Sequence, residues 1–130
     1  MEYTRLNFEE YQKESKKTAQ YPVLKMTDTK TPYAYFPEEN KMGFLYPALG
    51  LAGEAGEVLE NIKRIIRDDE GKVSPERRDK IKKELGDVLW YLSQLSSEFG
   101  LNLNDIAQDN LTKLFDRLKR EKIKGEGDER

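Results

Sequence analysis

The feature that most constrains the fold is a helical repeat of apolar residues between positions 45 and 68. At 100° per residue these side chains lie on one side of a helix: Leu45, Leu49, Ala52, Leu59, Ile62 and Ile66. Gly50, Gly53 and Gly56 recur inside the same stretch, and a glycine in a helix interior costs up to about 1 kcal/mol relative to alanine. A helix is therefore predicted here. We expect this loss of helix stability to be offset because glycines let neighbouring backbones approach closely, either beside the acids at 54 and 57 or in a helix-packing groove.

Three further stretches favour helices. Residues 7–21 carry a sparse apolar stripe behind Asn7, a residue type that caps helix N-termini. Ser74-Pro75 begins another helix, which extends to Gly100, and Asn102 begins the last one. No stretch of the sequence alternates apolar and polar residues as a half-buried strand does. The sequence thus predicts an all-α protein built as a four-helix bundle.

The 130 residues are expected to form a single domain, 1–130. Its core is predicted to span 45–120. Residues 22–43 are rich in proline and aromatic side chains and show no regular period, which indicates a loop. We expect this long loop to act as a lid. Residues 122–130 have the composition of a polar tail.

Composition limits the classes of protein and partner. Charged residues make up 37% of the chain and hydrophobic residues 36%. A core this thin gains stability by association with another copy of the chain, so we expect an oligomer. The formal net charge of −2 offers no positive field for nucleic acid, which is an unlikely partner. No segment resembles a signal peptide or membrane span, so we expect a cytoplasmic protein with no membrane partner.

The acidic residues carry the candidate chemistry, because the chain contains no cysteine and no histidine. Two pairs share one spacing, Glu54-x-x-Glu57 and Glu84-x-x-Asp87. Each pair lies on one helix face, so two adjacent helices bring four carboxylates together. Their repulsion requires protons or a multivalent cation, and hard oxygen ligands select Mg²⁺ or Mn²⁺. The alternative is that these acids form solvated faces or pair with lysine and arginine.

A third set of polar residues follows on the last predicted helix. Asn110, Lys113 and Arg117 lie on one face, three and four residues apart. Beside a metal cluster, an amide and two cations would bind a polyphosphate. The alternative is an ordinary solvent-exposed helix face.

Three motifs occur in order: Gly50-Leu-Ala-Gly-Glu-Ala-Gly-Glu57, then Glu84-Leu-Gly-Asp-Val-Leu-Trp-Tyr91, then Asn110-x-x-Lys113-x-x-x-Arg117. Together they resemble the MazG-type nucleoside triphosphate pyrophosphohydrolases of the all-α NTP pyrophosphatase superfamily. The resemblance covers about residues 45–120. The N-terminal Asn7-Phe-Glu-Glu-Tyr-Gln12 and the C-terminal Gly-x-Gly-Asp-x-Arg are similar to the small single-domain bacterial and phage branch.

This resemblance implies hydrolysis of (deoxy)nucleoside triphosphates between the α and β phosphates, for nucleotide-pool control or house-cleaning. The products are a nucleoside monophosphate and pyrophosphate. The resemblance implies two or more Mg²⁺ or Mn²⁺ ions, with these metal ligands: Glu54, Glu57, Glu84 and Asp87. It assigns phosphate or ribose contacts to Asn110, Lys113 and Arg117. It also implies a dimer or a dimer of dimers, with the active site near a subunit interface.

The proton of the attacking water must pass to a carboxylate, since no imidazole is present. Glu57 is our choice of acceptor because both acidic motifs reach it, and Glu84 is the second predicted catalytic residue. Base recognition needs an aromatic face and polar groups for the base edge. The candidates are Gln12, Tyr46, Arg64 and Tyr91, with Trp90 beside them. For Trp90 and Tyr91 a purely structural role is the alternative.

Two alternative functions stay open. One is a base-specific enzyme of the dUTPase or dCTPase type, or a hydrolase that accepts diphosphates as well as triphosphates. The other belongs to a different class: a non-enzymatic helical interaction protein in which the acids bind a structural cation or none.

Overall fold

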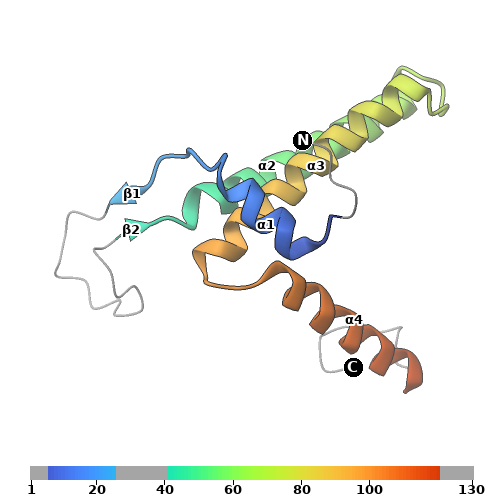
Figure 1. The fold of residues 1–130 in the computed structure, drawn as a ribbon. Helices are drawn as coiled ribbons and strands as arrows, with labels where there is room; N and C mark the ends of the chain where they lie inside the picture. The colour runs from blue at the N-terminus through green and yellow to red at the C-terminus, as the bar shows by residue number, and fades with distance from the viewer. Residues whose placement is uncertain (1–5, 26–40, 121–130) are drawn as a thin grey trace.

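The computed structural model describes residues 6–25 and 41–120, which form four helices and two short strands (Figure 1). The elements are α1 (Phe8–Lys16), β1 (Leu24–Lys25), β2 (Lys41–Met42), α2 (Leu45–Arg67), α3 (Pro75–Glu98) and α4 (Leu103–Lys119). α2 and α3 pack antiparallel as a long hairpin, and α1 packs against α3. α4 contacts α1 and extends away from the hairpin (Figure 1). The predicted all-α class and the four helices are confirmed.

Three of the helices, α1, α3 and α4, begin at the predicted capping residues. Asn7 Oδ1 accepts a hydrogen bond from Glu10 N at 2.8 Å, and the Glu10 carboxylate accepts one from Asn7 N at 3.3 Å. This reciprocal pair is a capping box. The side chains of Ser74 and Asn102 likewise accept backbone N–H groups at the starts of α3 and α4. Gly100 follows α3 with a φ of 66°, a conformation that favours glycine after a helix.

The first helix is shorter than predicted, since α1 ends at Lys16 rather than at Tyr21. The backbone N–H groups of residues 17–19 donate to carbonyls three residues earlier, which tightens the chain into a 3₁₀-type turn. Thr18 Oγ1 also donates to a main-chain carbonyl in this turn, at 2.7 Å. Pro22 then disfavours helical backbone at the residue before it. Because of these local effects the helix ends earlier than the apolar stripe of residues 7–21 indicates.

The predicted loop 22–43 contains a small element that the sequence did not reveal. β1 and β2 pair antiparallel, with Leu24 opposite Met42 and Lys25 opposite Lys41. Strands of two residues are too short to show an apolar alternation, which is why the sequence shows no strand pattern in this stretch. The rest of the predicted lid, 26–40, lies outside the described residues, as does the predicted tail, 122–130.

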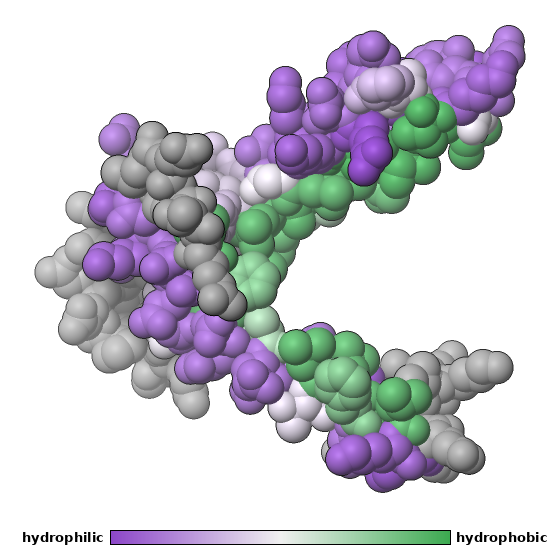
Figure 2. All heavy atoms as spheres, turned by 45° about the vertical axis from the view of Figure 1, so that its right-hand side comes forward, coloured by the Kyte–Doolittle hydropathy of each residue, from purple (hydrophilic) through white to green (hydrophobic). Residues whose placement is uncertain are grey.

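Apolar side chains remain exposed along α2, α3 and α4. Among the described residues, Leu103 is the one large hydrophobic side chain that is fully buried, at 3% exposure. The exposed set includes Leu49, Leu59, Ile62 and Ile66 on α2, Leu85 on α3, and Leu111, Leu114, Phe115 and Leu118 on α4. Apolar surfaces of the hairpin and of α4 border a wide hollow (Figure 2). The described helices of one copy therefore do not close around a common apolar core.

No helix among the described residues has a stretch long and apolar enough to cross a membrane.

One of the three glycines of α2 lies at a close helix contact. A Cβ added to Gly50 would overlap the ring of Tyr91 on α3. Added to Gly53 or Gly56, it would meet no described atom within 4 Å. The expectation that Gly53 and Gly56 allow the acid-bearing backbones to approach is therefore wrong within one copy of the chain. Gly50 is the glycine that lets α2 and α3 come together.

This contact predicts opposite effects for two alanine substitutions. Gly50→Ala is expected to lower the free energy of unfolding by about 1 to 3 kcal/mol, because overpacking at a tight contact costs about that much. Gly86→Ala in α3 is the matched control, since its Cβ meets nothing within 4 Å. It is expected to raise the free energy of unfolding by up to about 1 kcal/mol through helix propensity. Urea unfolding followed by circular dichroism measures both, and equal stabilities would contradict the contact.

Candidate functional site

Three of the four predicted metal ligands meet between α2 and α3. Glu54 on α2 and Glu84 and Asp87 on α3 each offer one carboxylate oxygen, and these oxygens lie within 4.8 Å of one another. The three-residue spacing places Glu84 and Asp87 one turn apart on the side of α3 that faces α2. Two residues of one helix and one of the next therefore form a single acidic cluster, which we call the carboxylate cluster.

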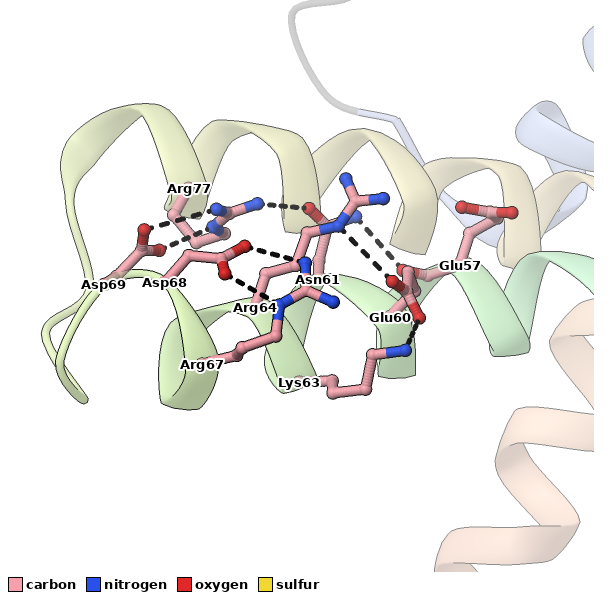
Figure 3. A network of polar contacts seen from close by, with 9 residues as sticks. All are labelled: Glu57, Glu60, Asn61, Lys63, Arg64, Arg67, Asp68, Asp69 and Arg77. Atoms are coloured by element: carbon pink, nitrogen blue, oxygen red, sulfur yellow. Dashed lines mark hydrogen bonds and ion pairs between the residues drawn. The ribbon is translucent and has the colours of Figure 1, made fainter.

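Glu57 lies beside the carboxylate cluster and not within it. It is exposed, and it is not among the side chains whose oxygens meet. Its charge still contributes to the raised pKa of Glu54. In Figure 3 the Glu57 carboxylate points away from the ion pair of Glu60 with Lys63. The structure thus leaves Glu57 next to the cluster with its carboxylate open to solvent.

The electrostatics of the cluster favour a bound cation. Burial raises the pKa of Glu54, and the charges of Asp87, Glu84 and Glu57 raise it further. Like charges this close destabilise one another unless a proton or a cation compensates them. The donors are hard carboxylate oxygens in a chain with neither histidine nor cysteine, which is the chemistry that Mg²⁺ and Mn²⁺ prefer. The residues present therefore fit a divalent metal.

Two tyrosines border the cluster. Burial raises the pKa of Tyr91, and the neighbouring Tyr46 and Glu54 add to the effect. Tyr11 on α1 also has a raised pKa, through burial and the charge of Asp87. Sequence reasoning did not single out Tyr11, because its proximity to Asp87 depends on how α1 packs on α3. The available signal was its place inside the N-terminal motif.

Tyr46 provides an exposed aromatic face near the cluster. It stacks on Tyr21 at 5.7 Å between ring centroids, and its ring lies 6.5 Å from that of Tyr91. Its side chain is 42% exposed. It also lines a pocket of about 270 Å³ whose other walls are apolar: Pro22, Val23, Leu45 and Leu49. Trp90 belongs to the same aromatic group, and its Nε1 donates to Thr18 Oγ1 at 2.8 Å.

The other two predicted base-binding residues make different contacts. Gln12 on α1 donates from Nε2 to Ser97 Oγ at 3.0 Å and to the Leu101 carbonyl at 2.8 Å. Its Oε1 accepts from Leu103 N at 2.8 Å, so Gln12 holds the start of α4. Arg64 lies farther along α2 and forms an ion pair with Glu60 on the same helix, at 3.4 Å.

The predicted phosphate-binding residues lie apart from the cluster within one copy. Asn110 and Lys113 are exposed on α4, whereas Arg117 is buried, at 4% exposure. α4 packs on α1 and diverges from the hairpin that carries the carboxylates (Figures 1 and 2). One copy of the chain therefore does not bring these three residues to the carboxylate cluster.

Comparisons with known proteins agree with the motifs. A family model described as the MazG nucleotide pyrophosphohydrolase domain matches residues 46–121. The chain is 44% identical over 88 residues to the gene 37 protein of Mycobacterium phage L5, a name that states no activity. The aligned region covers 68% of this chain and 77% of the phage protein. No solved structure matches.

The matched region contains α2, α3 and α4 almost completely, and with them the carboxylate cluster. It covers more than half of the chain, which confirms the resemblance of the three motifs. The chain belongs to the MazG nucleotide pyrophosphohydrolase domain family.

Proposed function

We propose that this protein hydrolyses (deoxy)nucleoside triphosphates between the α and β phosphates in a reaction that requires Mg²⁺ or Mn²⁺. The observation that carries the proposal is the meeting of Glu54, Glu84 and Asp87 in a chain of this family. The products are a nucleoside monophosphate and pyrophosphate. Nucleotide-pool control or house-cleaning in the cytoplasm is the biological task that fits this reaction.

Each residue of the site has a defined task in this proposal. Glu54, Glu84 and Asp87 would hold the divalent ions. Two or more ions would bind, with Glu57 as a further ligand. Bound divalent cations supply Lewis acidity toward the phosphate oxygens and the attacking water. Glu57 accepts the proton of that water, because its carboxylate lies beside the cluster and is open to solvent.

The base is proposed to stack on Tyr46 at the apolar pocket, with Tyr91 between this face and the carboxylates. The support is the exposed ring of Tyr46, the 270 Å³ pocket and the proximity of Tyr91 to Glu54. An apolar pocket without a polar side chain other than Tyr46 discriminates weakly between bases. A panel of ribonucleotides and deoxyribonucleotides, including dUTP, dCTP and the diphosphates, separates a broad enzyme from a base-specific one.

A second copy of the chain is proposed to complete the site in a homodimer or homotetramer. The exposed leucines and isoleucines of α2 and the exposed apolar face of α4 are the surfaces that a partner would cover. Both surfaces border the hollow in Figure 2. α4 of the partner would then bring the exposed Asn110 and Lys113 to the triphosphate, where an amide and a cation stabilise the pyrophosphate group. Arg117, buried at 4% exposure in one copy, joins them if association uncovers its guanidinium.

Acid-to-amide substitutions on α3 test the catalytic proposal. Glu84→Gln and Asp87→Asn are expected to lower turnover at least about 100-fold, because each removes a charged metal ligand while the helix stays intact. Asp79→Asn, an exposed acid on the same helix, is the control and is expected to keep activity. Chromatographic separation of monophosphate, pyrophosphate and orthophosphate measures the reaction. Release of orthophosphate alone would contradict cleavage between the α and β phosphates, and full activity of Glu84→Gln would contradict the metal assignment.

The raised pKa of Glu54 predicts a pH dependence in protein treated with a chelator. A carboxyl group with a raised pKa in the folded state stabilises the fold below its ordinary pKa of 4.5, and this stability is lost as the pH rises through the raised value. At pH 7, Glu54→Gln is therefore expected to unfold at a higher temperature than the wild type. The difference should close as the pH falls below 4.5.

Glu60→Gln is the control with the opposite sign. The hydrogen bond from Lys63 lowers the pKa of Glu60, so its contribution to stability is present at neutral pH and lost in acid. Its substitution is expected to lower the thermal midpoint slightly at pH 7. Thermal melts by circular dichroism measure all three proteins, and a lower midpoint for Glu54→Gln at pH 7 would contradict the repulsion in the cluster.

Complementation between two inactive variants tests the shared site. Glu84→Gln retains the α4 residues and Lys113→Ala retains the carboxylates, so each variant alone is expected to be inactive. A heterodimer isolated through two different tags would contain one intact composite site, with about half of the wild-type activity per dimer. No recovery of activity in a stable heterodimer would place Lys113 and the carboxylates of a site on the same chain.

A further inference from the structure

A polar network joins α2 and α3 near the closed end of the hairpin (Figure 3). Asn61 is 4% exposed, and its Nδ2 donates to the main-chain carbonyl of Glu57 at 3.1 Å. Its Oδ1 accepts from Nη1 of Arg77 on α3 at 3.2 Å. Arg77 also donates from Nε to Asp69 Oδ2 at 2.8 Å, and its side chain is 12% exposed. One guanidinium thus joins the start of α3 to Asn61 inside α2 and to Asp69 in the turn that follows α2.

The spacing of this network along the hairpin matches that of the carboxylates. Asn61 lies seven residues after Glu54, and Arg77 lies seven residues before Glu84. Seven residues are about two helical turns, so each pair shares a helix face. Because α2 and α3 are antiparallel, the Asn61–Arg77 contact brings Glu54 level with Glu84.

The opposite side of the cluster has a second close contact between α2 and α3. Gly50 lies four residues before Glu54, and Tyr91 lies four residues after Asp87. The close approach of Gly50 to the Tyr91 ring therefore brings Glu54 level with Asp87. The carboxylate cluster is therefore bracketed by two contacts between the helices. The polar contact brings Glu54 level with Glu84, and the steric contact brings it level with Asp87, one turn further along α3.

This alignment has little support from buried apolar side chains. The fully buried residues of α2 and α3 are polar or proline: Pro47, Asn61, Ser93, Gln94 and Ser96. A slip of one residue moves a side chain by about 1.5 Å along the axis, and a slip of one turn by about 5.4 Å. The three carboxylate oxygens lie within 4.8 Å of one another, so a slip of one turn would separate the oxygen on α2 from those on α3.

We propose that Arg77 and Asn61 are positioning residues that set the register of α2 against α3 and so assemble the carboxylate cluster for its metal ion. The inference rests on the proposed metal site and assigns this alignment to two residues outside the acidic motifs. Arg77 acts through geometry, since its guanidinium binds Asp69 and Asn61 at the same time.

Manganese binding by the full-length protein tests the proposal without relying on catalysis. The variants are Arg77→Gln, Arg77→Lys and Asp69→Asn. The matched control is Arg67→Gln, which removes another arginine ion pair near the same end of the hairpin. Arg67 binds its neighbour in sequence, Asp68, at 2.7 Å and is 58% exposed, so this pair joins no two helices. Electron paramagnetic resonance of free Mn²⁺ measures the dissociation constant at a temperature where every variant is fully helical by circular dichroism.

Arg77→Gln is expected to weaken Mn²⁺ binding about tenfold or more, the range found when residues that orient metal ligands are removed. Arg77→Lys and Asp69→Asn should fall between it and the wild type, because each keeps part of the network. Arg67→Gln should bind within about twofold of the wild type.

A network that served stability alone would lower the melting temperature of Arg77→Gln and leave its Mn²⁺ affinity equal to that of Arg67→Gln. That outcome would overturn the positioning proposal and leave the proposed function intact. A wild-type protein that binds Mn²⁺ no better than Glu84→Gln would overturn both.

Discussion

The structure depends on the alignment of two antiparallel helices that each carry acidic residues toward the other. Glu54 from α2 meets Glu84 and Asp87 from α3, and burial together with the repulsion of the neighbouring acids raises the pKa of Glu54. Such an arrangement is unfavourable for a protein without a cation and useful for one that binds a divalent ion. The rest of the hairpin is organised around this contact: Gly50 allows the approach on one side, and Arg77 with Asn61 joins the helices on the other.

The incomplete core of one copy and the separation of the proposed phosphate-binding residues from the carboxylate cluster have the same cause. α4 is anchored at its start through Gln12 and then leaves the hairpin, so its apolar face and its proposed phosphate-binding residues both lie away from α2 and α3. A partner that covers the apolar surfaces would bring the basic side chains of its α4 to the carboxylates at the same time. Association and substrate binding are then two consequences of one interface, in a chain of 130 residues with few apolar side chains.

Local signals in the sequence predicted much of this fold. Asn7, Ser74 and Asn102 cap the helices where expected. The spacing of the acids predicted that four carboxylates would meet; Glu54, Glu84 and Asp87 do, and Glu57 lies beside them. What the sequence did not reveal depends on contacts between distant elements. The packing of α1 determines the position of Tyr11 beside Asp87, and the direction of α4 explains why Lys113 lies apart from the acids. Gly53 and Gly56 illustrate the same limit, because a residue type alone does not say which neighbour it faces.

The most direct test of the central claim is a crystal structure of the protein grown with Mn²⁺ and a non-hydrolysable triphosphate analogue, with anomalous scattering data. Anomalous peaks are expected between the carboxylates of Glu54, Glu84 and Asp87, with the phosphates on the same ions and Lys113 of a partner subunit nearby. Carboxylates that stay apart, with manganese absent or bound elsewhere while the analogue is present, would contradict that claim.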